Sequence, residues 1–305
     1  MRKTIIFTAI LAGILAFSAC KKDETTTSLP SLEGLSVSQA IPYVAVGENL
    51  VFKAKTTNLY TSDNSTPEAI GLFWQVNSAR RDTLTTDIKK ENPEYTYHID
   101  TLGNYQLTCY AYANGYYNAS VVTAFQAIDP AKALTGLGKF NTAIINGKEW
   151  ISSNLNSEGA GVSYMKATVV DPLFGRLYTW EEASTACPSG WHLPSAEEWD
   201  AIDKTAGDLM APAKFLDEDM WKPALGQAIT NSTNFNAIPV GYLDNTASVN
   251  SFRRHGEIAA FWTSSEAASD PSLAQFRYII YDSNEIMKGS GDKTSLALSV
   301  RCVKN

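Results

Sequence analysis

The first third of the chain alternates hydrophobic and polar residues over short segments that are separated by polar residues, glycine and proline. Alternation with a period of two, rich in aromatic and β-branched residues, is typical of half-buried strands. The clearest segments are Leu50–Lys55, Gly71–Val76, Tyr105–Tyr112 and Val121–Ile128. Several short strands at this spacing predict an all-β sandwich over residues 32–130.

A different pattern begins near residue 139. Thr179–Glu182 and Ser195–Glu198 each place Glu three residues after Thr or Ser, which is the capping box of a helix start. They predict helices over residues 180–187 and 196–206, the second ending at Gly207. Further strands are predicted over residues 261–264, 275–281 and 296–303. Helices followed by strands indicate an α+β domain over residues 139–305.

The amino terminus has the features of a secretion signal. Arg2 and Lys3 precede the weakly polar to apolar run Thr4–Ala16, which is shorter than the roughly 20 residues of a spanning helix. The run closes on Phe17-Ser18-Ala19-Cys20, which resembles the lipobox of bacterial lipoproteins. The resemblance implies a signal peptide of residues 1–19 and a lipid on Cys20. The alternative is an ordinary signal peptide, with Cys20 there by coincidence.

Residues 20–31 are mostly polar, and we interpret them as a tether. Lys21-Lys22-Asp23-Glu24 is similar to the stretch that follows the lipidated cysteine in surface-exposed lipoproteins of Bacteroidetes-type bacteria, although a solvated linker would look the same. The lipidated cysteine of bacterial lipoproteins is diacylated, and two acyl chains anchor a protein stably in a membrane whereas a single chain does not. We therefore expect a lipid anchor in the cell outer membrane, with the protein facing the exterior.

Charge narrows the range of partners. The 305 residues hold 25 basic and 32 acidic side chains, a net charge of −7, and the isoelectric point is near 5.1. Removal of residues 1–19, which carry two bases and no acids, gives 23 − 32 = −9. Phosphate backbones are bound by basic surfaces, and the sequence has no basic stripe. We expect no nucleic-acid partner.

Residues of the predicted sandwich resemble a known module. Thr101–Thr108, Asn114-Gly115-Tyr116 and the last strand are similar to the closing half of polycystic-kidney-disease-like modules, and Trp74 stands where these modules have a central Trp. Their Gly-Asp-Gly turn after that Trp is replaced here by Gln75–Ser78. The resemblance implies an immunoglobulin-like sandwich and leaves its subtype open.

A longer motif run lies in the second domain. Gly175–Trp180, Ala186–Ser195 and Glu198-Trp199 resemble the Fibrobacter succinogenes major paralogous domain family. Agreement continues at Gly147–Trp150, Asn154-Leu155, Phe235–Tyr242, Phe261–Glu266 and Ser299–Val303, so it covers residues 139–305. The family implies a C-type-lectin-like fold, related to the core of formylglycine-generating enzymes and found in secreted and surface proteins.

The resemblance also implies a disulfide. C-type-lectin-like domains join a cysteine of the first helix to one in the final strand, and Cys187 and Cys302 occupy those places. Export to an oxidising compartment permits the bond. Two buried free thiols are the alternative, and Cys109 is expected to be a buried small hydrophobic residue.

The sequence lacks the residues that several more specific activities require. The cysteine pair that binds copper in the related oxidases is absent, as are the Glu-Pro-Asn, Gln-Pro-Asp and Trp-Asn-Asp triplets of calcium-dependent lectins. His98, His192 and His255 form no zinc pair and no nucleophile-elbow context. Asp217-Glu218-Asp219 is interpreted as a solvated charge run. We expect no metal, no cofactor and no enzymatic activity.

Binding remains the best-supported function. The segment between the helices and the last strands supplies the usual ligand face of this fold, and Arg, Trp and Tyr are frequent in recognition sites. The candidate ligand-binding residues are Arg253, Arg254, His255, Trp262, Tyr278 and Tyr281. Alternatively, Trp262 and Tyr278 belong to the core and Arg253-Arg254 to a solvated turn. We expect a surface lipoprotein that binds a glycan or a protein partner; the alternatives are a structural subunit or adhesin, and a carbohydrate-active enzyme.

The predicted anchor can be tested directly. Cys20→Ser removes the thiol that would be acylated, so the variant should move from the membrane fraction to the soluble fraction on fractionation of cells. A variant that stays with the membranes would show that Cys20 is not the anchor.

Overall fold

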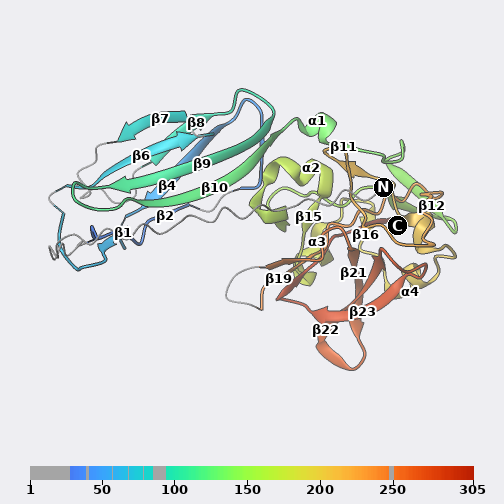
Figure 1. The fold of residues 1–305 in the computed structure, drawn as a ribbon. Coiled ribbons are helices and arrows are strands. Elements are labelled where there is room, and N and C mark those ends of the chain that lie inside the picture. Colours follow the sequence, from blue (N-terminus) through green and yellow to red (C-terminus); the bar gives the residue numbers. More distant parts are fainter. Residues whose placement is uncertain are drawn as a thin grey trace, which may run out of the picture.

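The computed structural model describes residues 28–38, 41–56, 58–67, 69–77, 79–84, 94–246 and 251–305. The predicted signal peptide, Cys20 and most of the tether lie outside the described residues. The described chain is mostly β-structure with short helices (Figure 1). None of the helices in these ranges is long and apolar enough to cross a membrane.

Residues 28–128, which we call the N-terminal layers, form two main sheets. The larger has the strand order β3 (Tyr43–Ala45), β10 (Ala119–Ile128), β9 (Gly103–Tyr112), β6 (Gly71–Val76) and β7 (Ala79–Leu84). The smaller has the order β2 (Ser36–Val37), β4 (Asn49–Lys55) and β8 (Glu94–His98), and β1 (Leu32–Glu33) pairs with β5 (Tyr60–Thr61). The strand predicted over Gly71–Val76 has the predicted first and last residues. The other strands predicted in this region are also present, but each begins earlier than predicted.

One hydrophobic cluster joins these two sheets. Trp74 of β6 is fully buried and stacks on Tyr95 of β8, with ring centroids 5.4 Å apart. Phe52 of β4 packs against Phe125 of β10 at 5.9 Å. Cys109 is buried opposite Trp74, and burial raises the pKa of its thiol to about 12, so it stays protonated. The alternating residues therefore meet in a core, as their period of two requires.

Residues 129–305, which we call the C-terminal part, contain the helices and the remaining sheets. The helices and 3₁₀ turns are α1 (Pro130–Ala133), η1 (Tyr164–Lys166), η2 (Thr168–Val170), α2 (Asp171–Phe174), α3 (Trp180–Ala186), α4 (Ala196–Asp200) and α5 (Ala206–Leu209). One short sheet has the order β11 (Leu134–Thr135), β17 (Lys214–Phe215) and β18 (Glu218–Asp219). A second pairs β14 (Val162–Ser163) with β15 (Arg176–Leu177). A third has the order β12 (Thr142–Ile145), β13 (Lys148–Ile151), β25 (Val303–Lys304) and β16 (Trp191–His192).

Two three-stranded sheets complete the C-terminal part. One has the order β21 (Ile258–Ala267), β22 (Asp270–Ile280) and β23 (Met287–Asp292). The other has the order β20 (Ser251–Arg253), β19 (Tyr242–Asp244) and β24 (Leu296–Ala297). The strand predicted over residues 296–303 is therefore interrupted. Leu298 and Ser299 make isolated bridges to Tyr178 and Phe261, and Arg301 turns into the core.

The second predicted helix is shorter than expected. Both predicted capping boxes are present, but α4 ends at Asp200, whose carboxylate accepts hydrogen bonds from Arg277 and Lys288. Thr205 and Asp208 form a third capping box, which starts α5. Gly207 lies inside α5, where a Cβ atom would come within 2.0 Å of the Ala228 carbonyl oxygen. This glycine permits a close approach and does not end the helix.

The disulfide between Cys187 and Cys302 is present, with Cα atoms 5.9 Å apart. It joins the residue that ends α3 to the residue that precedes β25. The bonded residues are 115 positions apart, and closing a loop of that length contributes about 4–5 kcal/mol in the chain-entropy account of disulfides. The implied pairing is therefore confirmed.

Beside the disulfide, Arg301 is fully buried. Its guanidinium donates to Asn154 Oδ1 at 2.9 Å and to the carbonyl oxygens of Ile151, Phe235 and Asn236. The ring of Phe235 lies 4.5 Å from its Cζ. Burial lowers the pKa of Arg301 to about 9, so it remains charged at neutral pH. Among the residues that the structure describes, no carboxylate pairs with it.

Replacing this side chain should be costly. Arg301→Met removes the donors of several buried oxygens, so the free energy of unfolding should fall by roughly 3–5 kcal/mol in urea denaturation. Arg253→Met, at an exposed position of β20, should change it by about 0.5 kcal/mol or less. Equal stability of the two variants would contradict a structural role for Arg301.

Candidate functional site

A hollow of about 480 Å³ lies between the β20-β19-β24 sheet and the β21-β22-β23 sheet. We call it the aromatic hollow. Its aromatic walls are Tyr242 of β19 and Phe276 and Tyr278 of β22. Its polar groups include Asp244, Arg254, Lys288, Ser290, Asp292 and Ser295. A concave site with aromatic walls and a few polar groups is the usual form of a ligand pocket.

The rings are placed by strand geometry. Phe276 and Tyr278 are two residues apart on β22, so both project from the same face. Phe276 lies over Gly289 of β23, where an added Cβ would come within 2.4 Å of the ring. The indole of Trp262 packs edge-on against Phe276 at 6.0 Å. The aromatic wall therefore depends on a glycine beside it and a buried Trp behind it.

The charged groups of the hollow are held by neighbours. Arg254 donates to Glu257 at 2.9 Å. Lys288 follows the alternation of β23 to the other face of the sheet, where it donates to Asp200 at 2.7 Å, so its charge lies outside the hollow. Asp244 Oδ1 accepts from the hydroxyl and amide of Thr246, and these bonds lower the pKa of Asp244.

The carboxylate of Asp292 is held by similar hydrogen bonds. Its Oδ1 accepts bonds from the amides and hydroxyls of Thr294 and Ser295, which lower its pKa. Both Asp244 and Asp292 are therefore carboxylates at neutral pH. A general acid would need a raised pKa, so neither is suited to donate a proton.

The six predicted ligand-binding residues do not form one patch. Arg254 and Tyr278 line the aromatic hollow. His255 and Tyr281 line a separate groove, which also includes residues of the N-terminal layers. Arg253 is exposed on β20 opposite Tyr242 and lines neither. The turn at residues 254–257 thus separates side chains that are close in sequence.

The interpretation of Trp262 requires correction. Its side chain is fully buried, and its indole N–H donates to the carbonyl oxygen of Tyr178 at 2.8 Å. It therefore cannot contact a ligand at the surface. The alternative that Trp262 belongs to the core is the correct one, because β21 is covered on this face.

Tyr242 and Phe276 are site residues that the sequence analysis did not name. Phe276 could have been found from Tyr278, because residues two apart on a strand share a face. Tyr242 offers no comparable pattern, since β19 reaches the hollow only through pairing with β20 and β24.

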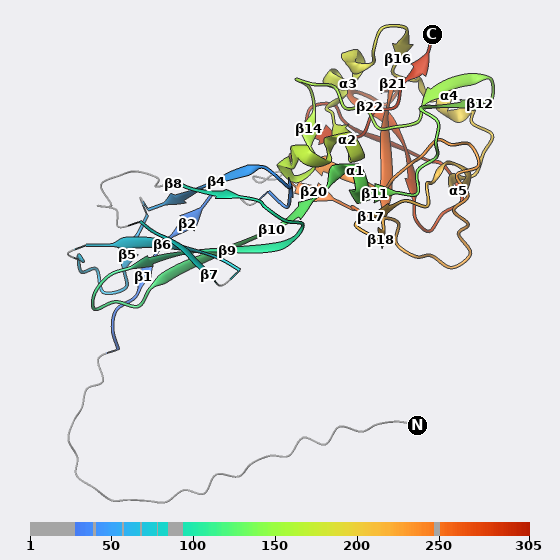
Figure 2. The ribbon, with the colours of Figure 1, turned by 90° about the horizontal axis from the view of Figure 1, so that it is seen from above.

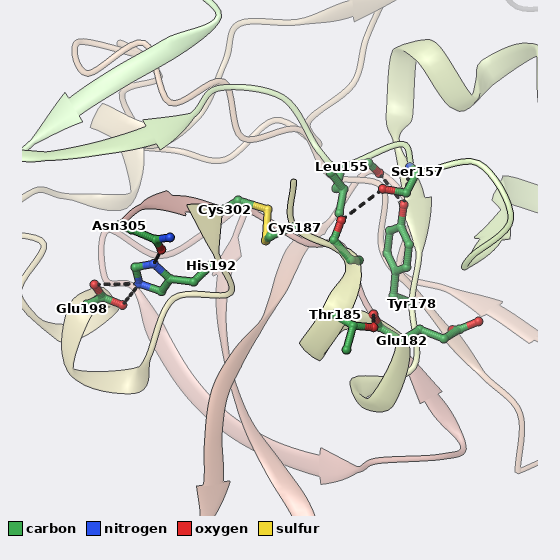
Figure 3. The surroundings of a disulfide bond; sticks show 11 residues. Leu155, Ser157, Tyr178, Glu182, Thr185, Cys187, His192, Glu198, Cys302 and Asn305 are labelled. Atoms are coloured by element: carbon green, nitrogen blue, oxygen red, sulfur yellow. Dashed lines mark hydrogen bonds and ion pairs between the residues drawn. A yellow bond between two sulfur atoms is a disulfide. The ribbon is translucent and has the colours of Figure 1, made fainter. Parts of the chain in front are cut away.

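His192 lies in a polar cluster near the disulfide (Figure 3). Its Nδ1 is 2.7 Å from Asn305 Oδ1, and its Nε2 is 3.0 Å from Glu198 Oε2. Glu198 also accepts from Lys148 and from the backbone amide of Ser195. His192 therefore links the last residue of the chain to the start of α4.

Within the described ranges, no cluster of three or more His, Cys, Asp or Glu side chains is arranged to hold a metal ion. Cys187 and Cys302 are bonded to each other, and the Cys109 thiol is buried in the N-terminal layers. Asp219 pairs with Lys214 at 3.2 Å, as expected of a solvated charge run.

Comparisons with known proteins give one informative match. The profile of the Fibrobacter succinogenes major domain family matches residues 140–304, more than half of the chain. A comparison with curated protein sequences found no match.

Two solved structures align weakly. A quinonprotein alcohol dehydrogenase-like protein of Bacteroides thetaiotaomicron aligns with 36% of this chain and 21% of its own, at 18% identity and a TM-score of 0.21. Adhesin InvE of Yersinia pseudotuberculosis aligns with 90% of this chain and 70% of its own, at 12% identity and a TM-score of 0.27. Scores this low say nothing about the fold or the activity of this chain.

The Glu198 cluster predicts a pH dependence. Burial raises the pKa of Glu198, but bonds from Ser195, Lys148 and His192 outweigh it and hold the pKa below its ordinary 4.5. The carboxylate therefore stabilises the fold above pH 4.5, and this contribution is lost as the pH falls through the lowered value.

Glu198→Gln should accordingly reduce the free energy of unfolding by about 1–3 kcal/mol at pH 7. The difference from the wild type should shrink in urea denaturation as the pH falls below 4.5 and through the lowered pKa. Glu197→Gln, at the exposed neighbouring position, is the matched control. A constant difference across the pH range would argue against this role.

Proposed function

Because the chain belongs to the Fibrobacter succinogenes major domain family, we propose that it is a non-enzymatic protein that binds a glycan in the aromatic hollow. One observation carries the proposal: Tyr242, Phe276 and Tyr278 line a single hollow whose lining also includes ionised carboxylates and Arg254. Aromatic faces stack on the apolar faces of sugar rings, while charged and polar side chains hydrogen-bond to hydroxyl groups.

The proposal includes the finer fold. We propose a C-type-lectin-like fold for the C-terminal part, supported by a disulfide that joins the end of a helix to the residue before the last strand. For the N-terminal layers we propose an immunoglobulin-like sandwich, supported by two sheets that share one core. In this arrangement the sandwich is a spacer between the membrane and the binding part.

We further propose that lipid on Cys20 anchors the protein in the outer membrane, facing the exterior. The motif around Cys20 and the polar residues that follow it support this location. Exposure at the cell surface would give the aromatic hollow access to glycans outside the cell.

Catalysis is the weaker alternative. Glycoside hydrolysis commonly requires one carboxyl group with a raised pKa to protonate the leaving oxygen. Asp244 and Asp292 line the hollow, but hydrogen bonds lower the pKa of each. These carboxylates suit the binding of hydroxyl groups better than proton donation.

The hollow can be tested with the Cys20→Ser protein on a glycan array. Replacing both Tyr242 and Tyr278 with Leu keeps apolar bulk but removes the aromatic faces, so binding to the retained glycan should weaken roughly tenfold or more. Tyr117→Leu, at an exposed position in the N-terminal layers, should leave binding unchanged.

Other outcomes distinguish the competing functions. Cleavage of an array glycan would show an enzyme. Self-association of the protein with no glycan retained would favour a structural subunit or an adhesin, and the proposed glycan-binding function would then be wrong.

A further inference from the structure

A second, larger concavity lies where the N-terminal layers meet the C-terminal part. It encloses about 1020 Å³, and we call it the joint groove. Figure 2 shows this junction, where β10 passes into α1. Tyr43 of β3 and Gln126 of β10 line one wall, and the opposite wall includes Glu218, Trp221, Gln227 and Tyr281. Neither part of the chain forms this groove alone.

The walls are held by contacts on both sides of the junction. Tyr43 packs edge-on against Phe215, with ring centroids 5.0 Å apart. The amide of Leu216 donates to the carbonyl oxygen of Ala133 at 2.8 Å, and the amide of Lys222 donates to that of Gly256 at 2.8 Å. Because these bonds fix both walls, the groove exists before any ligand arrives, as ligand sites usually do.

Backbone strain is present at the rim. Leu216 and Asp217 connect β17 to β18 with φ angles of 53° and 67°. Two-residue turns of this kind favour Asn-Gly, because a residue with a Cβ atom is disfavoured in the left-handed region. Strain of this kind clusters at binding sites, where the surroundings hold it in place. Leu216 itself lines the joint groove.

The lining has the chemistry of a carbohydrate site. Tyr43 and Tyr281 are half-buried, so part of each ring remains accessible. Gln126 and Gln227 are also half-buried, and Glu218 adds an exposed carboxylate. Gln227 Nε2 donates to Met210 Sδ at 3.5 Å, which leaves its second N–H and its amide oxygen for a ligand. Rings match the C–H faces of a sugar, and amides and carboxylates match its hydroxyl groups.

Charge and size narrow the class of ligand. Lys222 is paired with Glu257, which Arg254 also contacts, and Asp219 is paired with Lys214, while Glu218 lies on the rim. Burial lowers the pKa of His255, so this side chain adds no positive charge at pH 7. A polyanion would therefore meet a neutral to acidic lining. The volume is at the upper end of the usual range for ligand pockets, about 300–1,000 Å³, and exceeds the needs of a single sugar.

We propose that the joint groove binds a neutral oligosaccharide chain. The inference rests on the proposed glycan-binding function for its ligand class, but it uses residues outside the aromatic hollow. It assigns the N-terminal layers a part in recognition, through Tyr43 and Gln126, in addition to their part as a spacer.

The test uses the full-length Cys20→Ser protein and calorimetric titration with neutral hexasaccharides of glucose, xylose, mannose and N-acetylglucosamine. The double variant Gln126→Ala/Gln227→Ala removes hydrogen bonds from both walls and should weaken binding of the best hexasaccharide roughly tenfold. Ala224→Trp, at a half-buried lining position, should block the groove and abolish that binding. Gln75→Ala, on β6 of the same large sheet, is the matched control.

Each outcome separates this inference from the proposed function. Weaker binding in both groove variants, with Gln75→Ala unchanged, supports the inference. Binding that is lost only in the Tyr242/Tyr278 variant overturns it and leaves the proposed function intact. If no hexasaccharide binds, or if a heparin hexasaccharide binds the groove more tightly than the neutral ones, the inference fails; the glycan array then decides the proposed function independently.

Discussion

A buried positive charge constrains the C-terminal part. Arg301 has no carboxylate partner among the described residues, so its charge is tolerated only because backbone carbonyls and Asn154 surround it. Those oxygens come from segments near residues 151–154 and 235–236, far apart in the sequence. An arrangement that lost them would leave an unsolvated guanidinium, which is among the most costly defects in a core. Arg301 thus holds the long segment before β21 against the first strands, and the adjacent Cys302 fixes the same point covalently to the end of α3.

The candidate sites follow from this constraint. The segment between α5 and β21 contains the short strands β17 to β20 joined by long loops. It supplies Tyr242 and Arg254 to the aromatic hollow and Trp221, Gln227 and His255 to the joint groove. A loop-rich wall can keep a defined shape when its backbone is bonded at several points. Here Lys222 bonds to Gly256, and Tyr281 bonds to Glu257. The loop residues of the joint groove agree with the common arrangement in which a rigid scaffold positions binding loops, whereas the rings of the aromatic hollow lie on strands.

Local features were the most predictable from sequence. The capping boxes at Thr179 and Ser195 appear where they were expected, because a hydroxyl and a carboxylate three residues apart satisfy the helix start without help from the rest of the chain. The end of α4 was mispredicted, since Asp200 is held by Arg277 and Lys288 from strands far along the chain. Trp262 was misassigned for a related reason: aromatic residues serve cores and binding sites equally, and only packing separates the two.

The sequence by itself determined the strand-rich composition, the positions of the helix starts, the family resemblance and the cysteine pairing that it implied. These rest on short-range patterns or on a motif run that needs no coordinates to recognise. Only the tertiary structure decided which side chains share a surface. It separated Arg254 and Tyr278 from His255 and Tyr281, buried Trp262 and brought Tyr43 to the joint groove. The physical reason is that a turn of a few residues, such as 254–257, directs neighbouring side chains to different sides of the molecule, and pairing between distant strands decides what each of them meets.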